Sequence, residues 1–177
     1  MVDLAMLQVV RDLVAIFGVI AGFTYYVMTV RNNNKARKTQ QLLLLHQRWF
    51  EKETQRDLIE LNEMEWDDYD DFLEKYDSAV NPDNFSKRTF LWNYMDGLGY
   101  LLSQNLIDIE SVYYLMSGFV PEFMWRKWEP ILIERRKRYN NPDLYIWFEY
   151  LANEIKKMRV KRGLASETID VDGYLKK

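Results

Sequence analysis

The sequence predicts an all-α protein in which a single N-terminal transmembrane helix is followed by a multi-helix bundle. Three observations lead to this prediction. Residues 13–30 form an uncharged, apolar stretch near the start of the chain. From residue 36 onward, apolar side chains recur at the three- and four-residue spacing of buried helix faces. No run alternates apolar and polar residues with hairpin chemistry, so no strand is expected.

Residues 13–30 are long enough to cross a bilayer almost completely. An 18-residue helix covers roughly 27 Å, close to the thickness of the hydrocarbon core. A cleaved signal peptide is one alternative, but the chain starts without positive charge and the apolar run has no small-residue cleavage site. A buried core helix is another, but this stretch is apolar on every face. We therefore expect a membrane anchor with its basic flank at 1–35, a helical domain at 36–162 and a flexible tail at 163–177.

The basic flank of this stretch predicts its orientation. Arg31, Lys35, Arg37 and Lys38 follow the stretch with no acid among them, whereas a lone Arg11 precedes it. Positive residues accumulate on the cytoplasmic side, so we expect a single-pass protein of the cell membrane with its C-terminal domain in the cytoplasm. The same four cations are expected to contact lipid head groups.

Two glycines within the apolar stretch predict close packing against another transmembrane helix. Gly18 and Gly22 have GxxxG spacing, which allows two helix backbones to approach each other. A homo-oligomer is thus one expected state of the chain.

Composition narrows the classes of function. The 177 residues carry a net charge of −3 and a pI of about 5.3, which argues against general nucleic-acid binding. The chain has no cysteine, so disulfide frameworks and thiolate metal sites are excluded. Its one histidine, His46, cannot supply the paired Glu-x-x-His motifs of a di-iron bundle, and no G-x-S-x-G nucleophile elbow occurs. We predict no catalytic residue and no cofactor, and the sequence favours a non-enzymatic role.

Turn and cap signals divide the domain into helices. The first helix is expected to continue from the membrane to about residue 52, and a second stretch, separate or continuous with it, surrounds residues 58–64. Further helices are expected at 67–76, 86–105 and 108–116, with a loop at 77–84. Pro121 suits the first turn of a helix that is kinked at Pro130, and Asn141 and Pro142 are expected to start the last helix, which ends at Gly163.

Two helix faces and two glycines are expected to build the core. One face belongs to the helix at 86–105 and the other to the last helix. Gly97 and Gly99 are expected to mark the close approach of a neighbouring helix. The predicted faces are Phe90, Leu91, Tyr94, Leu98, Leu101 and Leu102, and Leu144, Phe148, Leu151, Ile155 and Met158.

The most unusual segment is acidic. Residues 63–77 hold eight acids and one lysine. On one helix face, oxygen ligands could bind a hard cation such as Ca²⁺ or Mg²⁺, although no EF-hand spacing is present. The candidate metal ligands are Asp67, Asp70, Asp71 and Glu74.

A protein partner is the other functional interpretation of this segment. Its aromatic side chains would then act as anchors within an acidic surface. The candidate interaction residues are Trp66, Asp67, Asp68, Tyr69, Asp70 and Asp71. The plainer interpretation, which the composition favours, is a solvated acidic helix whose aromatic side chains face the core.

Several short motifs along the chain resemble one family. They are WDDYDDF at 66–72 with Tyr76, WNYMDGLGYLL at 92–102, LIDIE at 106–110 and WEPI at 128–131. Together with the N-terminal span, they resemble an uncharacterised family of small membrane-anchored helical proteins of bacteria and archaea, over about residues 13–159. The resemblance implies a helical domain and carries no activity, cofactor or catalytic residue.

From these observations we expect a membrane-anchored interaction module or an accessory subunit of a membrane complex. Its partners would be membrane lipids and either another protein or a second copy of the chain. The alternative is a metal-binding enzyme or sensor that uses the acidic face from Asp67 to Glu74. A third interpretation is a structural, lipid-associated protein held by the basic flank.

Overall fold

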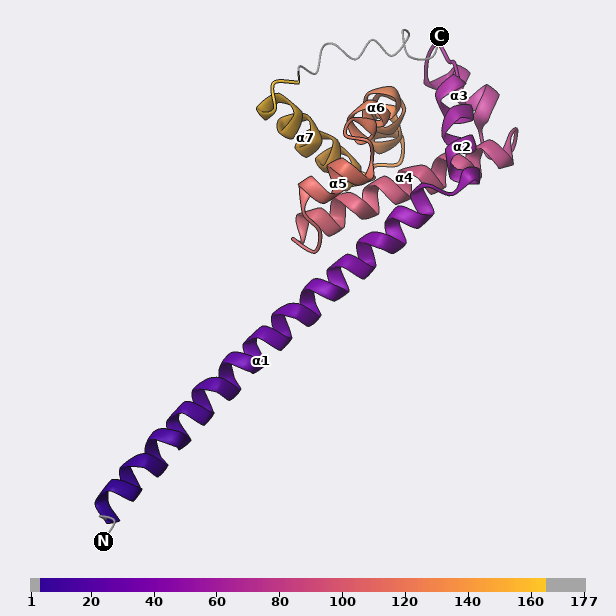
Figure 1. Ribbon diagram of the computed structural model, residues 1–177. Helices are drawn as coiled ribbons and strands as arrows, with labels where there is room; N and C mark the ends of the chain where they lie inside the picture. Colours follow the sequence, from indigo (N-terminus) through magenta and orange to yellow (C-terminus); the bar gives the residue numbers. More distant parts are fainter. Residues whose placement is uncertain (1–3, 165–177) are drawn as a thin grey trace. The chain divides into compact units, whose positions relative to one another are not determined.

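The computed structural model (Figure 1) describes residues 4–164, except for the side chains at positions 4, 5, 38 and 41. These residues form seven helices and no strand, which confirms the predicted all-α fold. The chain divides into two compact units, Met1–Leu44 and Leu45–Lys177, and each is described by itself. The tail expected at 163–177 lies outside the described residues beyond position 164.

The first unit consists of most of helix α1, which spans Leu4–Trp49 without a break (Figure 1). Its apolar side chains face outward, and Phe17, Val19 and Phe23 are each about two-thirds exposed or more. The helix is long and apolar enough to cross a membrane. Within it, the Thr24 hydroxyl donates to the Ile20 carbonyl, so this polar group is satisfied inside the helix.

The C-terminal end of α1 belongs to the second unit. Trp49 is buried and stacks on Tyr94, with 5.6 Å between ring centroids, and the Tyr94 hydroxyl donates to the Leu45 carbonyl. The helix ends at Trp49, and α2 (Lys52–Glu63) follows as a separate helix. Side chains of Thr54 and Gln55 donate to the last carbonyls of α1, which explains where it stops.

Helix α4 (Pro82–Ser103) begins earlier than its predicted start at residue 86. The Asn81 side chain accepts from the backbone N–H of Asn84, and Pro82 occupies the first helical position. The predicted buried face is correct for Leu91, Leu98 and Leu102, whereas Phe90 is 36% exposed. Trp92 and Met95, absent from the predicted face, are fully buried.

Helices α5 (Ile109–Leu115) and α6 (Val120–Arg138) follow the sequence signals closely. Asp108 caps α5 by accepting from the N–H of Ser111, as expected. Gly118, at a φ of +80°, separates α5 from α6. Pro121 lies in the first turn of α6, and α6 continues through Pro130 to Arg138.

Helix α7 (Ile146–Lys161) begins later than predicted, and the predicted start at Asn141 and Pro142 is wrong. Asn141 instead accepts from the N–H of Asp143 in a local turn. The N-terminus of α7 is capped from α4, because Asp96 accepts from the N–H groups of Trp147 and Phe148. The cap is therefore supplied by a residue about fifty positions earlier in the chain.

The core lies where α4 and α6 pack against α7. Phe148, Leu151 and Ile155 are fully buried, as the predicted seam requires. Gly99 permits the contact, because a Cβ there would lie 1.8 Å from the backbone carbonyl oxygen of Trp147. Gly97 has no such neighbour and is exposed, so the predicted close approach is right for Gly99 and wrong for Gly97.

Candidate functional site

The acidic segment surrounds helix α3 (Tyr69–Tyr76), which is shorter than predicted. Asp68 is its N-cap, and one carboxylate oxygen accepts from the N–H groups of Asp70 and Asp71 at 3.0 Å each. Asp67 precedes the helix. The candidate metal ligands Asp67, Asp70, Asp71 and Glu74 consequently do not share one helical face.

Two of the candidate metal ligands, Asp70 and Asp71, bind groups of the chain itself. Asp71 accepts from Lys75 Nζ at 2.8 Å and from the backbone N–H of Asp67 at 2.9 Å, and the Lys75 hydrogen bond lowers the pKa of Asp71. Asp70 pairs with Arg138 of α6 at 2.8 Å. Within residues 4–164 no three acidic or histidine side chains are placed to share a cation.

The aromatic residues of the segment differ in exposure. Tyr69 is 8% exposed and lies under the Arg138 guanidinium, 4.4 Å from the ring centroid. Trp66 is half-buried and stacks on Trp128, with 5.1 Å between ring centroids. Of the predicted interaction residues, Tyr69 is therefore a core side chain and Trp66 keeps a solvent-facing part.

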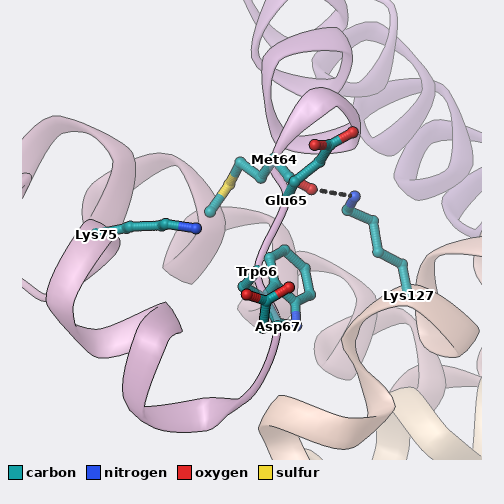
Figure 2. A pocket seen from close by; sticks show the side chains of 6 residues that line it. All are labelled: Met64, Glu65, Trp66, Asp67, Lys75 and Lys127. Atoms are coloured by element: carbon teal, nitrogen blue, oxygen red, sulfur yellow. Dashed lines mark hydrogen bonds between the residues drawn. The ribbon is translucent and has the colours of Figure 1, made fainter.

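A hollow of about 470 Å³ opens beside Trp66. It is lined by Met64, Glu65, Trp66, Asp67, Lys75 and Lys127. Figure 2 shows Lys75 and Lys127 reaching toward the segment 64–67 from two different helices. The walls thus combine an indole with two amines and two carboxylates.

Lys127 is the most constrained cation of this hollow. Its ammonium donates to the Met64 carbonyl at 2.8 Å (Figure 2). It also donates to the Asn62 carbonyl at 2.8 Å and lies 5.0 Å from the Trp66 ring centroid. Burial lowers the pKa of Lys127. Lys127 therefore holds the segment 62–66 against α6, and sequence reasoning gave no indication of this role.

A second polar cluster, also absent from the predictions, lies inside the domain. Arg88 of α4 is fully buried and donates to the Asn84 side chain at 2.8 Å and to the Tyr76 carbonyl. Its guanidinium lies over the rings of Phe72 and Phe85, at 4.8 and 4.9 Å. Burial lowers its pKa to about 10. The available sequence signal is an arginine on the apolar face of a helix, three residues after Phe85.

The predicted membrane-facing residues all lie on α1. Gly18 and Gly22 have no heavy atom within 4 Å of an added Cβ, and the side chains of Arg31, Lys35 and Arg37 are exposed. The side chain of Lys38 lies outside the described part of the structure. Both glycines are thus accessible to another helix in this structure.

Comparison with known proteins adds one finding. A search of curated proteins and a search of solved structures found no match to the chain. The family described as Domain of unknown function (DUF4760) matches residues 11–155, which include most of α1 and all of α2 to α6. The match covers well over half of the 177 residues, so the chain belongs to this family.

Proposed function

We propose that the chain is a membrane-anchored helical interaction module, acting as an accessory subunit of a membrane complex. The observation that carries this proposal is the uncovered apolar surface of α1. Side chains as large as Phe17 and Phe23 are exposed on all sides of this helix, and water is a poor solvent for such a surface. A bilayer would cover it, and the basic residues that follow would meet lipid head groups on the cytoplasmic side.

The hollow beside Trp66 is the surface that we propose for a protein partner. Asp68, Asp70 and Asp71 are engaged in a cap or in ion pairs. Glu65 and Asp67 are exposed and form no ion pair among the described residues. A half-buried indole flanked by these two carboxylates suits a basic partner with an apolar side chain that enters the hollow.

The alternative of a metal-binding enzyme or sensor has no comparable support. Of its proposed ligands, Asp70 pairs with Arg138, and Asp71 accepts from Lys75 and from the backbone N–H of Asp67. A cation would have to compete with each of these interactions. The partner interpretation needs no such rearrangement.

Crosslinking in the native membrane tests the proposal. A photoreactive residue replaces Asp67 in the full-length protein, and the crosslinked species are identified by mass spectrometry. We expect one recurrent protein partner whose yield falls in Glu65→Lys and is unchanged in Glu129→Lys, an exposed charge on α6. A chain that crosslinks to nothing, or whose yield is equal in both variants, would contradict the proposed surface.

Membrane association requires its own measurement. We expect the full-length chain to stay in the membrane fraction after alkaline washing, and a chain that starts at Arg31 to be released. Retention of the truncated chain on anionic liposomes would instead favour lipid binding through the basic flank. Release of the full-length chain would contradict anchoring.

A further inference from the structure

The buried polar atoms that lack a hydrogen-bond partner among the described residues are nearly all donors. They are Nε and Nη2 of Arg88, Nε1 of Trp92, Nε1 of Trp128, Nε of Arg135 and Nη2 of Arg136, and Asn62 Oδ1 is the one acceptor among them. Buried N–H groups are paired in almost all proteins. A set of donors without acceptors is complementary to a ligand that brings only acceptors.

Most of these donors surround Trp92. The guanidinium carbon of Arg88 lies 5.8 Å from its ring centroid, and that of Arg135 lies 5.5 Å from it. The rings of Trp128 and Tyr145 contact Trp92 edge to face, at 5.2 and 5.5 Å. Two arginines from two different helices, α4 and α6, therefore both lie against the Trp92 ring.

The acidic neighbour of Arg88, Asp77, is not paired with it among the described residues. Neither Arg88 nor Arg135 forms an ion pair there. Repulsion from Arg135 acts on Arg88 more strongly than attraction from Asp77, its first acidic neighbour. Two cations placed together in a desolvated environment are unfavourable unless an anion accompanies them.

Two tyrosine side chains, Tyr69 and Tyr145, lie near Arg135. Tyr69 and Tyr145 are both within electrostatic range of Arg135, and burial raises the pKa of each hydroxyl. Neutral hydroxyls of this kind donate to an oxygen ligand without adding negative charge.

We propose that Arg88 and Arg135 form a binding site for a small oxyanion such as phosphate. Tyr69 and Tyr145 border this site. The planar guanidinium donates in parallel to two oxygens, the geometry that oxyanions accept. The complete burial of Arg88 restricts the site to a compact anion. This site is distinct from the hollow beside Trp66, although Tyr69 belongs to the acidic segment.

The test uses full-length protein in detergent micelles, exchanged into chloride. Sodium phosphate is added at constant ionic strength while the Nε–H resonances of the arginines are followed by ¹H–¹⁵N NMR. We expect the Arg88 and Arg135 resonances to shift and saturate at one anion per chain. Sulfate and acetate, added in separate titrations, distinguish a tetrahedral anion from a carboxylate.

Two variants make the result specific. Arg135 is half-buried, so Arg135→Gln is expected to fold and to bind phosphate at least about tenfold more weakly, as the loss of a charge-assisted hydrogen bond requires. Arg126→Gln removes an exposed charge from the same helix and is expected to bind like the unaltered chain. The absence of a saturable shift with all three anions would overturn the proposal. Equal weakening in both variants, or unchanged binding in Arg135→Gln, would also overturn it.

Discussion

The approach of α4 to α7 at Gly99 predicts that one added methyl group disrupts the core. In Gly99→Ala the new Cβ would lie 1.8 Å from the carbonyl oxygen of Trp147 and 2.5 Å from its carbonyl carbon. Both atoms are backbone, so the helices would have to separate by more than about 1 Å to restore contacts near 3.5 Å. Overpacking of this kind lowers the unfolding free energy by about 1–3 kcal/mol. It opposes the roughly 1 kcal/mol by which alanine stabilises a helix relative to glycine.

Gly97→Ala is the matched control, two positions earlier on the same helix. It meets no atom within 4 Å, so it should stabilise the domain by about 0.5–1 kcal/mol. Thermal unfolding of the full-length chain in micelles, followed by circular dichroism, gives both values. Each kcal/mol corresponds to a Tm change of about 3–5 °C for a domain of this size. Equal stability of the two variants would refute the assigned contact.

Three further predictions follow from buried polar contacts and from the N-terminal helix. Asp96→Ala should lower the unfolding free energy by about 0.5–2 kcal/mol, because it removes the cap of α7, whereas Asp96→Asn keeps an acceptor. Burial raises the folded-state pKa of Asp96 above 3.8. Protonation of Asp96 therefore adds stability that is fully present below that pH and is lost as pH rises through the raised pKa, whereas the ionised carboxylate still caps α7. Asp96→Asn should remove this slope in urea unfolding, and an unchanged slope would contradict the assignment. Glu122→Gln should cost about 3–5 kcal/mol, because Arg159, 2.7 Å away and 9% exposed, would stay buried without its carboxylate. A chain starting at Arg31 should leave the membrane fraction while keeping the circular dichroism of its helical domain, and loss of that signal would show that the domain depends on the span.

Local signals in the sequence predicted several helices correctly. They failed where the residue that caps a helix is distant in the sequence. Asp108 caps α5 through the N–H three residues later, a spacing that is visible in the sequence. The cap of α7 comes from Asp96, which no local pattern connects to residue 147. Asn141 carried the expected local signal, but its side chain closes a turn instead. Helix existence could therefore be predicted, whereas the start of α7 depended on packing.

The candidate site shows the same limit. The acidic face was inferred from spacing alone, and this spacing requires a helix that includes Asp67. The helix starts after Asp68 because that carboxylate caps it. Arg88 was missed for a related reason, since its burial depends on aromatic rings contributed by α3 and α4 together. Charge spacing describes a helix face only after the caps of the helix are known.

The two proposed sites are joined by a row of aromatic contacts. Trp66, at the hollow, stacks on Trp128 at 5.1 Å, and Trp128 contacts Trp92 at 5.2 Å. Trp92 in turn lies beside Arg88 and Arg135. An anion that binds only the folded domain stabilises this packed row by mass action. Occupancy of the arginine cluster would then favour the ordered position of Trp66, so partner crosslinking through Asp67 should be measured with and without phosphate.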